Sequence, residues 1–180
     1  LFAVLMAIAL VFSMGTIAFA EGTTGTIKID NALEGATYNI YKMFDFIPVA
    51  DSTTQGRYTV VAAWADFLTG DGADYLKVDA ATGTIVWNGE ETDARKADLA
   101  KAAIAYAKAK TITPADTKDA AADGAVTFDN VTLGYYAIDT SLGTICALTN
   151  VDNTFETHEK NEKPKIDKFV QEDSDDSWGK

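Results

Sequence analysis

The stretch Thr37–Phe44 reads Thr-Tyr-Asn-Ile-Tyr-Lys-Met-Phe, and its composition decides the fold class. Aromatic and branched apolar side chains of this kind favour β-strands. The preceding residues 33–36, Leu-Glu-Gly-Ala, are typical of a turn. Before the turn, Thr26–Asp30 alternates polar and apolar residues with a period of two, as a half-buried strand does. We therefore predict two consecutive strands and a mainly β fold.

Further short strands are predicted on the C-terminal side of this pair, separated by turn residues. Strands are expected at residues 57–61, 75–78, 84–87, 126–128, 134–139, 144–148 and 154–159. The strands at 75–78 and 84–87 flank Asp-Ala-Ala-Thr-Gly, which predicts a hairpin in which Gly83 supplies a positive φ. Many short strands with turns between them favour a β-sandwich.

Two helices are predicted within this β framework, which suggests an insertion between strands. A short helix is expected at Ala62–Leu68, and the clearest one at Asp93–Lys110, which is rich in Ala, Lys and Leu. Thr92 is placed to cap its N-terminus. The predicted buried face of this helix consists of Leu99, Ala103, Tyr106 and Ala107.

The N-terminal stretch is typical of a secretory signal. Residues 1–20 carry no charge and end in Ala18-Phe19-Ala20, a small-x-small cleavage pattern. We predict cleavage between Ala20 and Glu21, with the positively charged n-region missing from the sequence. A membrane anchor is the alternative, since about 20 apolar residues can span a bilayer. Either interpretation places the remaining chain outside the cytoplasm.

Composition excludes several function classes. The formal net charge of −12 argues against nucleic acid and against anionic membrane surfaces as partners, so membrane contact is expected only transiently, through the precursor. The single cysteine, Cys146, allows no internal disulfide and is expected to be a buried strand thiol. One histidine, His158, cannot build a zinc site with it, and we expect neither metal nor cofactor.

No sequence motif indicates an enzyme. The chain lacks a G-x-S-x-G elbow, a P-loop and a G-x-G-x-x-G fingerprint. A carboxylate pair for glycoside hydrolysis remains open, because 27 acidic residues always offer pairs, but most of these are expected to be solvated.

A lysine-rich joint separates the predicted first domain from a new strand. The joint, residues 159–164, reads Glu-Lys-Asn-Glu-Lys-Pro, and four lysines fall within residues 159–168. It is either a solvated linker or a segment that presents a lysine nucleophile. From Lys165 the chain alternates again. The predicted organisation is therefore a signal at 1–20, a first domain at 21–158, the joint at 159–164 and the start of a second domain at 165–180.

Four stretches, in this order, resemble the N-terminal region of a sortase-assembled major (backbone) pilin, an isopeptide-forming fimbrial protein of Gram-positive bacteria. GATYNIYKMFD at residues 35–45 resembles the GxTYxxYKxFD segment of these pilins, and TLGYYAIDT at 132–140 their L-G-Y-Y-x-I-D strand. EKNEKP at 159–164 resembles the pilin-motif ending, although His158-Glu159 replaces the Tyr-Pro of the better-known form. KIDKFVQEDSDDSWGK at 165–180 resembles the opening of the isopeptide-forming second domain.

The resemblance implies a structural subunit, not an enzyme. The first domain is expected to be an Ig- or CNA-like β-sandwich with inserted helices, followed by the first strand of a second sandwich. A class C sortase would join copies of the chain covalently, through an amide formed by Lys160 with Asn161 adjacent; Lys163 and Lys165 are its nearest rivals. The expected partners are other copies of the same pilin, the sortase, and minor or tip pilins, in a pilus on the cell wall that serves adhesion.

Intramolecular amide bonds are also implied. Lys168 shares a strand face with Ile166 and Val170, and a lysine that faces a core is costly unless it is neutral or paired. The resemblance implies that Lys168 condenses with an Asn beyond Lys180 in a self-catalysed reaction. First-domain candidates for such a bond are Lys28, Lys42, Asn150 and Asn153, and an exposed strand lysine is the alternative. The alternative function is a wall-anchored adhesin or stalk that binds a host or matrix ligand and does not polymerise.

Overall fold

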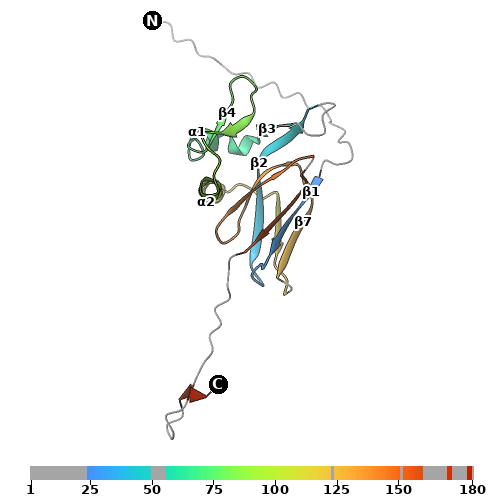
Figure 1. Cartoon of the computed structure of the whole chain (residues 1–180), viewed down its shortest axis with the longest axis vertical. Coiled ribbons are helices and arrows are strands. Elements are labelled where there is room, and N and C mark those ends of the chain that lie inside the picture. Colours follow the sequence, from blue (N-terminus) through green and yellow to red (C-terminus); the bar gives the residue numbers. More distant parts are fainter. Residues whose placement is uncertain are drawn as a thin grey trace.

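The computed structural model describes residues 24–49, 56–122, 124–150, 152–159, 170–171 and 178–179. Within these ranges the protein is mainly β, with a long helix and a short helical segment (Figure 1). The strands are β1 (Thr24–Asp30), β2 (Thr37–Pro48), β3 (Gly56–Val60), β4 (Leu76–Val78), β5 (Ile85–Trp87), β6 (Asp116–Asp119), β7 (Ala125–Thr132), β8 (Gly134–Ile138), β9 (Thr144–Leu148), β10 (Thr154–His158), β11 (Val170–Gln171) and β12 (Trp178–Gly179). The helical elements are η1 (Ala62–Trp64), α1 (Ala65–Thr69) and α2 (Asp93–Ala109).

The first sheet has the strand order β10-β1-β7. The central strand β1 pairs antiparallel with β7 and parallel with β10. Its period of two is as predicted: Ile27 and Ile29 are fully buried, whereas the Lys28 side chain on the opposite face is 38% exposed. The parallel pairing brings Thr26 opposite Thr154, so Thr24 and the end of β10 lie at opposite ends of the sheet.

The second sheet is antiparallel, with the order β3-β2-β8-β9 and with β6 added on β2. Strand β2 is longer than the predicted Thr37–Phe44 because its second half pairs with β3. It also departs from simple alternation, since Ile40 and Tyr41 are both buried, as are Met43 and Phe44. This pattern indicates a strand that is covered on both faces.

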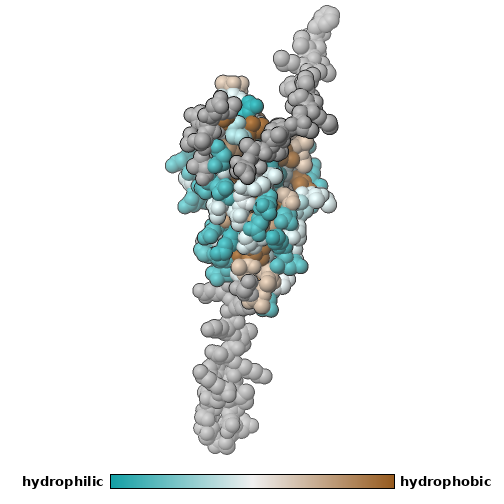
Figure 2. Space-filling view, turned by 90° about the vertical axis from the view of Figure 1, so that its right-hand side faces the viewer, coloured by the Kyte–Doolittle hydropathy of each residue, from teal (hydrophilic) through white to brown (hydrophobic). Residues whose placement is uncertain are grey.

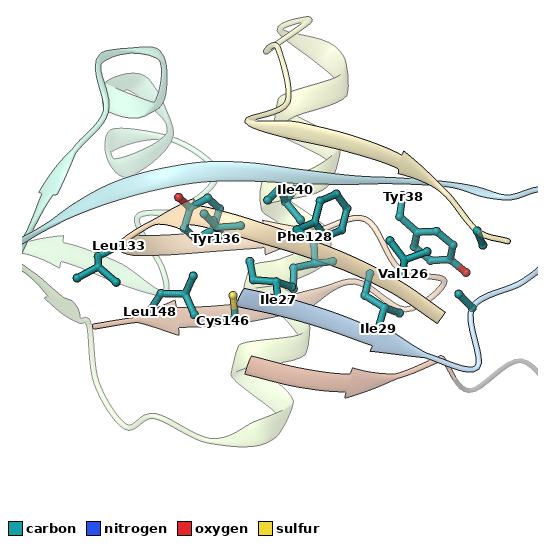
Figure 3. Packing of buried hydrophobic residues seen from close by; sticks show 14 residues of the cluster. Ile27, Ile29, Tyr38, Ile40, Val126, Phe128, Leu133, Tyr136, Cys146 and Leu148 are labelled. Carbon is teal, nitrogen blue, oxygen red and sulfur yellow. The ribbon is translucent and has the colours of Figure 1, made fainter. Parts of the chain in front are cut away.

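One hydrophobic cluster fills the space between the two sheets (Figure 3). Its side chains come from β1 and β7 on one side and from β2, β8 and β9 on the other: Ile27, Ile29, Val126, Phe128, Val131, Tyr38, Ile40, Tyr136, Ile138, Cys146 and Leu148. Cys146 is buried as predicted, and burial raises the pKa of its thiol well above the ordinary range. The two sheets therefore share a single core.

A second cluster covers the other face of the second sheet. It joins Tyr41, Met43 and Phe44 of β2 to Trp64, Phe67 and residues of α2. The predicted buried face of α2 is confirmed, since Leu99, Ala103, Tyr106 and Ala107 are all buried. The predicted cap is confirmed too: the Thr92 hydroxyl accepts a hydrogen bond from the Arg95 N–H at 3.3 Å. The helix packs against β8 and β9.

Most of the other predicted elements are present. The hairpin of β4 and β5 has Gly83 at φ 68°, as its turn requires. The predicted helix at Ala62–Leu68 is split into η1 and α1. Strand β6 was not predicted, because its sequence, Asp-Thr-Lys-Asp, carries no apolar signal. The face of the molecule in Figure 2 is largely polar, with small separate hydrophobic patches.

Several sequence predictions lie outside the described residues. These include the signal and its cleavage point at Ala20 and Glu21, and most of the predicted strand at 165–170. C-terminal to residue 159 the structure describes an antiparallel pairing of β11 with β12, in which Val170 lies opposite Gly179. No helix in the described part of the chain is both long enough and apolar enough to cross a membrane.

Candidate functional site

The site predicted from sequence begins directly after the last residue of the described first domain. Lys160, Asn161 and Lys168 lie outside the described residues. Glu159 is described, and it follows the last residue of β10. Glu159 is therefore the described residue that directly precedes the predicted nucleophile, Lys160.

Glu159 is buried, with 5% of its surface exposed, although sequence analysis placed it in a polar joint. Its Oε1 accepts a hydrogen bond from the backbone N–H of Ser141 at 2.8 Å, and its Oε2 accepts one from the Ser141 hydroxyl at 2.5 Å. Its own backbone N–H donates to the carbonyl oxygen of Asp30 at 2.9 Å. Side chain and backbone thus both bind Glu159 to the first domain.

Tyr38 lies close to the Glu159 carboxylate, and both side chains line the same hollow. The Tyr38 hydroxyl accepts a hydrogen bond from the Leu33 N–H at 3.0 Å. Burial raises the pKa of Tyr38 above its ordinary value, and the charge of Glu159 and a hydrogen bond to it raise the pKa further. An anionic acceptor favours the neutral phenol, which can donate a hydrogen bond to it. A small open hollow of about 210 Å³ adjoins this cluster, lined by Leu33, Ala36, Thr37, Tyr38, Asp139, Thr140, Ser141 and Glu159.

The turn between β8 and β9 presents Ser141 to Glu159, and α2 holds that turn. Lys108 of α2 forms an ion pair with Asp139 at 3.0 Å. Gly143 has φ 74°, and a Cβ at this position would lie 3.1 Å from Ile104 Cδ1, so the turn approaches the helix closely. Glycine tolerates the positive φ, and its lack of a Cβ permits the close approach to Ile104. The long helix therefore contributes indirectly to the arrangement around Glu159.

Lys28, a first-domain candidate for an intramolecular amide, is held by a carboxylate. Its Nζ lies 3.1 Å from Asp30 Oδ1. The hydrogen bond to Asp30, with the negative charges of Asp30 and Glu156, raises the pKa of Lys28 above 10.5. A charged amine is not a nucleophile, so this arrangement favours the alternative of an ordinary strand lysine. The nearby His158 Nδ1 lies 3.5 Å from Asp30 Oδ2.

Lys42 is more enclosed, with a side chain that is 19% exposed. Its Nζ pairs with Asp45 Oδ1 at 2.5 Å and donates to the Thr132 hydroxyl at 2.9 Å. Its stem passes over Gly134, where a Cβ would lie 2.6 Å from Lys42 Cε. The absence of a side chain at Gly134 therefore makes room for this lysine. Its amine contacts Asp45 on β2 and Thr132 on β7.

The two candidate asparagines lie near one another in the chain but differ in their surroundings. Asn153 accepts the Thr26 N–H at its backbone carbonyl at 2.8 Å, at the opposite end of β1 from the Lys28 amine. Asn150 is partly buried in the connection between β9 and β10. The structure thus does not bring Lys28 and Asn153 together, and an amide bond in the first domain stays a prediction.

A larger hollow, of about 660 Å³, lies between η1 and the C-terminal end of α2. Trp64, Tyr106, Lys42 and Lys110 contribute to its walls. The two aromatic residues are only 1% and 7% exposed, so their rings offer little surface for stacking on a ligand. Within the described ranges no group of three or more His, Cys, Asp or Glu residues is arranged to hold a metal ion.

Comparison with protein-family models gives no matching family, and comparison with curated proteins gives no match. The sequence motifs and the geometry around Glu159 are therefore the observations that bear on function. Sequence reasoning did not find Ser141 and Tyr38, because 18 residues separate Ser141 from Glu159 and no local pattern links them. A long-range contact of this kind has no signal in a single sequence.

Proposed function

We propose that this chain is a structural subunit of a covalently polymerised pilus on the cell surface, a substrate of a class C sortase that serves adhesion. The order of the four pilin-like stretches supports this, with EKNEKP at 159–164 beginning directly after β10. The single observation that carries the proposal is the fixed exit of the chain at Glu159, one residue before Lys160.

The proposed fold is an Ig- or CNA-like β-sandwich with helices inserted between its strands. Two sheets that enclose one hydrophobic cluster support it, as does the position of η1, α1 and α2 between β3 and β6 in the chain. Residues 165–180 would begin a second domain of the same kind, in which Lys168 forms its own amide bond.

The proposed reaction is acyl transfer to an amine. The sortase cysteine would hold the sorting signal of one subunit as a thioester. The neutral amine of Lys160 on the next subunit attacks the thioester carbonyl, the amide bond forms, the C–S bond breaks and the amine proton leaves as the thiolate is released. Lysine suits this role because its pKa falls readily on desolvation. The partners are the sortase, other copies of the chain, and minor or tip pilins.

The direction of the chain through the first domain fits a linear assembly. Since β1 and β10 run parallel, the chain enters beside Thr24 and leaves beside Glu159 at the opposite end. Tension that enters a polymer at Lys160 continues into the following residues and bypasses β1. In the alternative function, a non-polymerising adhesin or stalk, tension passes through the whole first domain.

Reconstitution with a class C sortase tests the proposal. The wild-type protein should form a ladder of multimers that survives boiling in detergent. Lys160→Arg keeps the positive charge but removes the primary amine, and it should leave only the monomer. Lys163→Arg and Lys165→Arg are matched controls that should still polymerise. A ladder that persists in Lys160→Arg and disappears in either control would assign the bond to that other lysine, and no ladder with any variant would favour the adhesin or stalk.

A further inference from the structure

Glu159 stands out because it is the one buried charged side chain in the described part of the protein. A carboxylate removed from water is costly unless hydrogen bonds replace its hydration. Here both oxygens accept bonds from Ser141, one from the backbone N–H and one from the hydroxyl. A charged group that receives hydrogen bonds at both oxygens is held more tightly than a neutral one. We call this pair of bonds the Glu159–Ser141 clamp.

The clamp holds the chain directly beyond the end of β10, where the pairing of that strand with β1 stops. Along β10 the side chains are exposed or only partly buried, and the strand lies at the edge of its sheet. Its pairing with β1 ends at His158 opposite Asp30. Beyond that point the chain is held by the Glu159 N–H on the Asp30 carbonyl and by the clamp to the turn between β8 and β9.

We propose that Glu159 is a positioning residue for the acceptor amine of Lys160, with Ser141 as its partner. This inference rests on the proposed function and deepens it. Ordering the backbone of a residue has an entropic cost. Because the Glu159 side chain already orders residue 159 in the folded protein, this cost does not arise again when the chain binds the acyl-enzyme. The clamp fixes residue 159, to which Lys160 is directly bonded, before the acyl-enzyme arrives.

The test is the rate of acyl transfer to Lys160 with the secreted protein, a class C sortase and a labelled sorting-signal peptide. Glu159→Ala should lower the rate at subsaturating pilin about tenfold, mainly through a higher KM for the pilin. Ser141→Ala should act in the same direction but less strongly, since the backbone bond remains. The double variant should be no slower than Glu159→Ala, because both substitutions remove one shared contact.

Three further variants separate positioning from other effects. Glu159→Gln keeps one acceptor oxygen and should restore part of the rate. Glu156→Gln is the matched control, since it makes the same change on an exposed residue of the same strand and should leave the rate unchanged. Lys160→Arg tests the proposed function itself and should abolish transfer.

Amide hydrogen exchange supplies a readout that does not depend on the sortase. In Glu159→Ala the residue-159 amide should exchange faster, while the amide of the buried residue Ile40 should keep its protection. Rates within twofold of wild type in both Glu159→Ala and Ser141→Ala, with Lys160→Arg inactive, would overturn the inference and leave the proposed function standing. Equal loss of protection at both amides would also overturn it, as general destabilisation. Continued transfer in Lys160→Arg would instead refute the assignment of Lys160.

Discussion

The backbone N–H of Thr26 donates to the carbonyl oxygen of Asn153 at 2.8 Å, and this bond begins the parallel pairing of β1 with β10. The first and the last strands of the domain are therefore neighbours, although more than a hundred residues separate them. Closing the domain in this way depends on a close approach of two backbones at Gly25, where any Cβ would overlap the Asn153 carbonyl.

The first prediction concerns this approach. Gly25→Ala should destabilise the first domain by about 1–3 kcal/mol, because the added methyl group meets backbone and not a movable side chain. Urea unfolding monitored by tryptophan fluorescence measures the effect. Lys28→Ala on the same strand is the control and should change the stability much less, since it removes only one surface ion pair with Asp30. Equal stability of Gly25→Ala and wild type would show that β10 can shift away.

The second prediction is mechanical. Pulling the domain apart between Thr24 and Glu159 stresses the β1–β10 hydrogen bonds together in shear, because the strands run parallel and the attachment points lie at opposite ends. Attachment at Thr24 and Asp152 should peel the strands one bond at a time instead. Single-molecule force measurements should therefore give a clearly higher unfolding force for the first geometry. Similar forces in both geometries would mean that the β1–β10 pairing does not limit unfolding.

The third prediction distinguishes a polymer from a simple stalk by using Cys146, which is 2% exposed. A buried thiol with a raised pKa resists alkylation until the domain opens. If Lys160 joins the subunits, tension along the fibre bypasses the first domain, and Cys146 should stay unlabelled when fibres are stretched. Labelling that increases with tension would place the first domain in the path of the force, as the alternative function requires.

The fourth prediction concerns Lys168, which the sequence alternation predicts to share a strand face with Ile166 and Val170. An ionised lysine there would be strongly destabilising, whereas an amide has no charge to desolvate. Condensation with asparagine releases ammonia, so the intact mass of the full-length protein should be lower by about 17 Da per bond. Lys168→Ala should remove one such deficit and make the second domain easier to proteolyse. An unchanged deficit in that variant would place the bond at another lysine.

Sequence patterns predicted those elements whose side chains carry a clear apolar or helical signal. The alternation of Ile27 and Ile29 and the small-residue face of α2 are examples, and both were confirmed. Strand β6 was missed because its stability comes from pairing with β2 and not from its own composition. The burial of Glu159 was missed for a related reason: a carboxylate is expected to be solvated unless its partners are known, and Ser141 is distant in sequence.

The last prediction is a loss of stability at high pH that originates in the tyrosines of the core. Burial raises the pKa of Tyr136 to about 12, and burial likewise raises that of Tyr58 to about 12, from an ordinary value of 10.0. A tyrosine with a raised pKa keeps its proton longer in the folded state than in the unfolded state. Its contribution is therefore complete below pH 10 and is lost as the pH rises through 12.

Urea midpoints measured between pH 8 and pH 12 should accordingly be constant at first and then fall above pH 10. Tyr136→Phe should flatten part of that fall, because phenylalanine has no proton to lose. At pH 8 the same variant should be less stable by about 1 kcal/mol, since the Tyr136 hydroxyl donates to the Thr132 carbonyl at 2.6 Å. Tyr75→Phe, which removes the hydroxyl of a partly exposed ring, is the matched control for the loss of a tyrosine hydroxyl. A profile for Tyr136→Phe that runs parallel to wild type over the whole range would show that this buried phenol does not cause the alkaline transition.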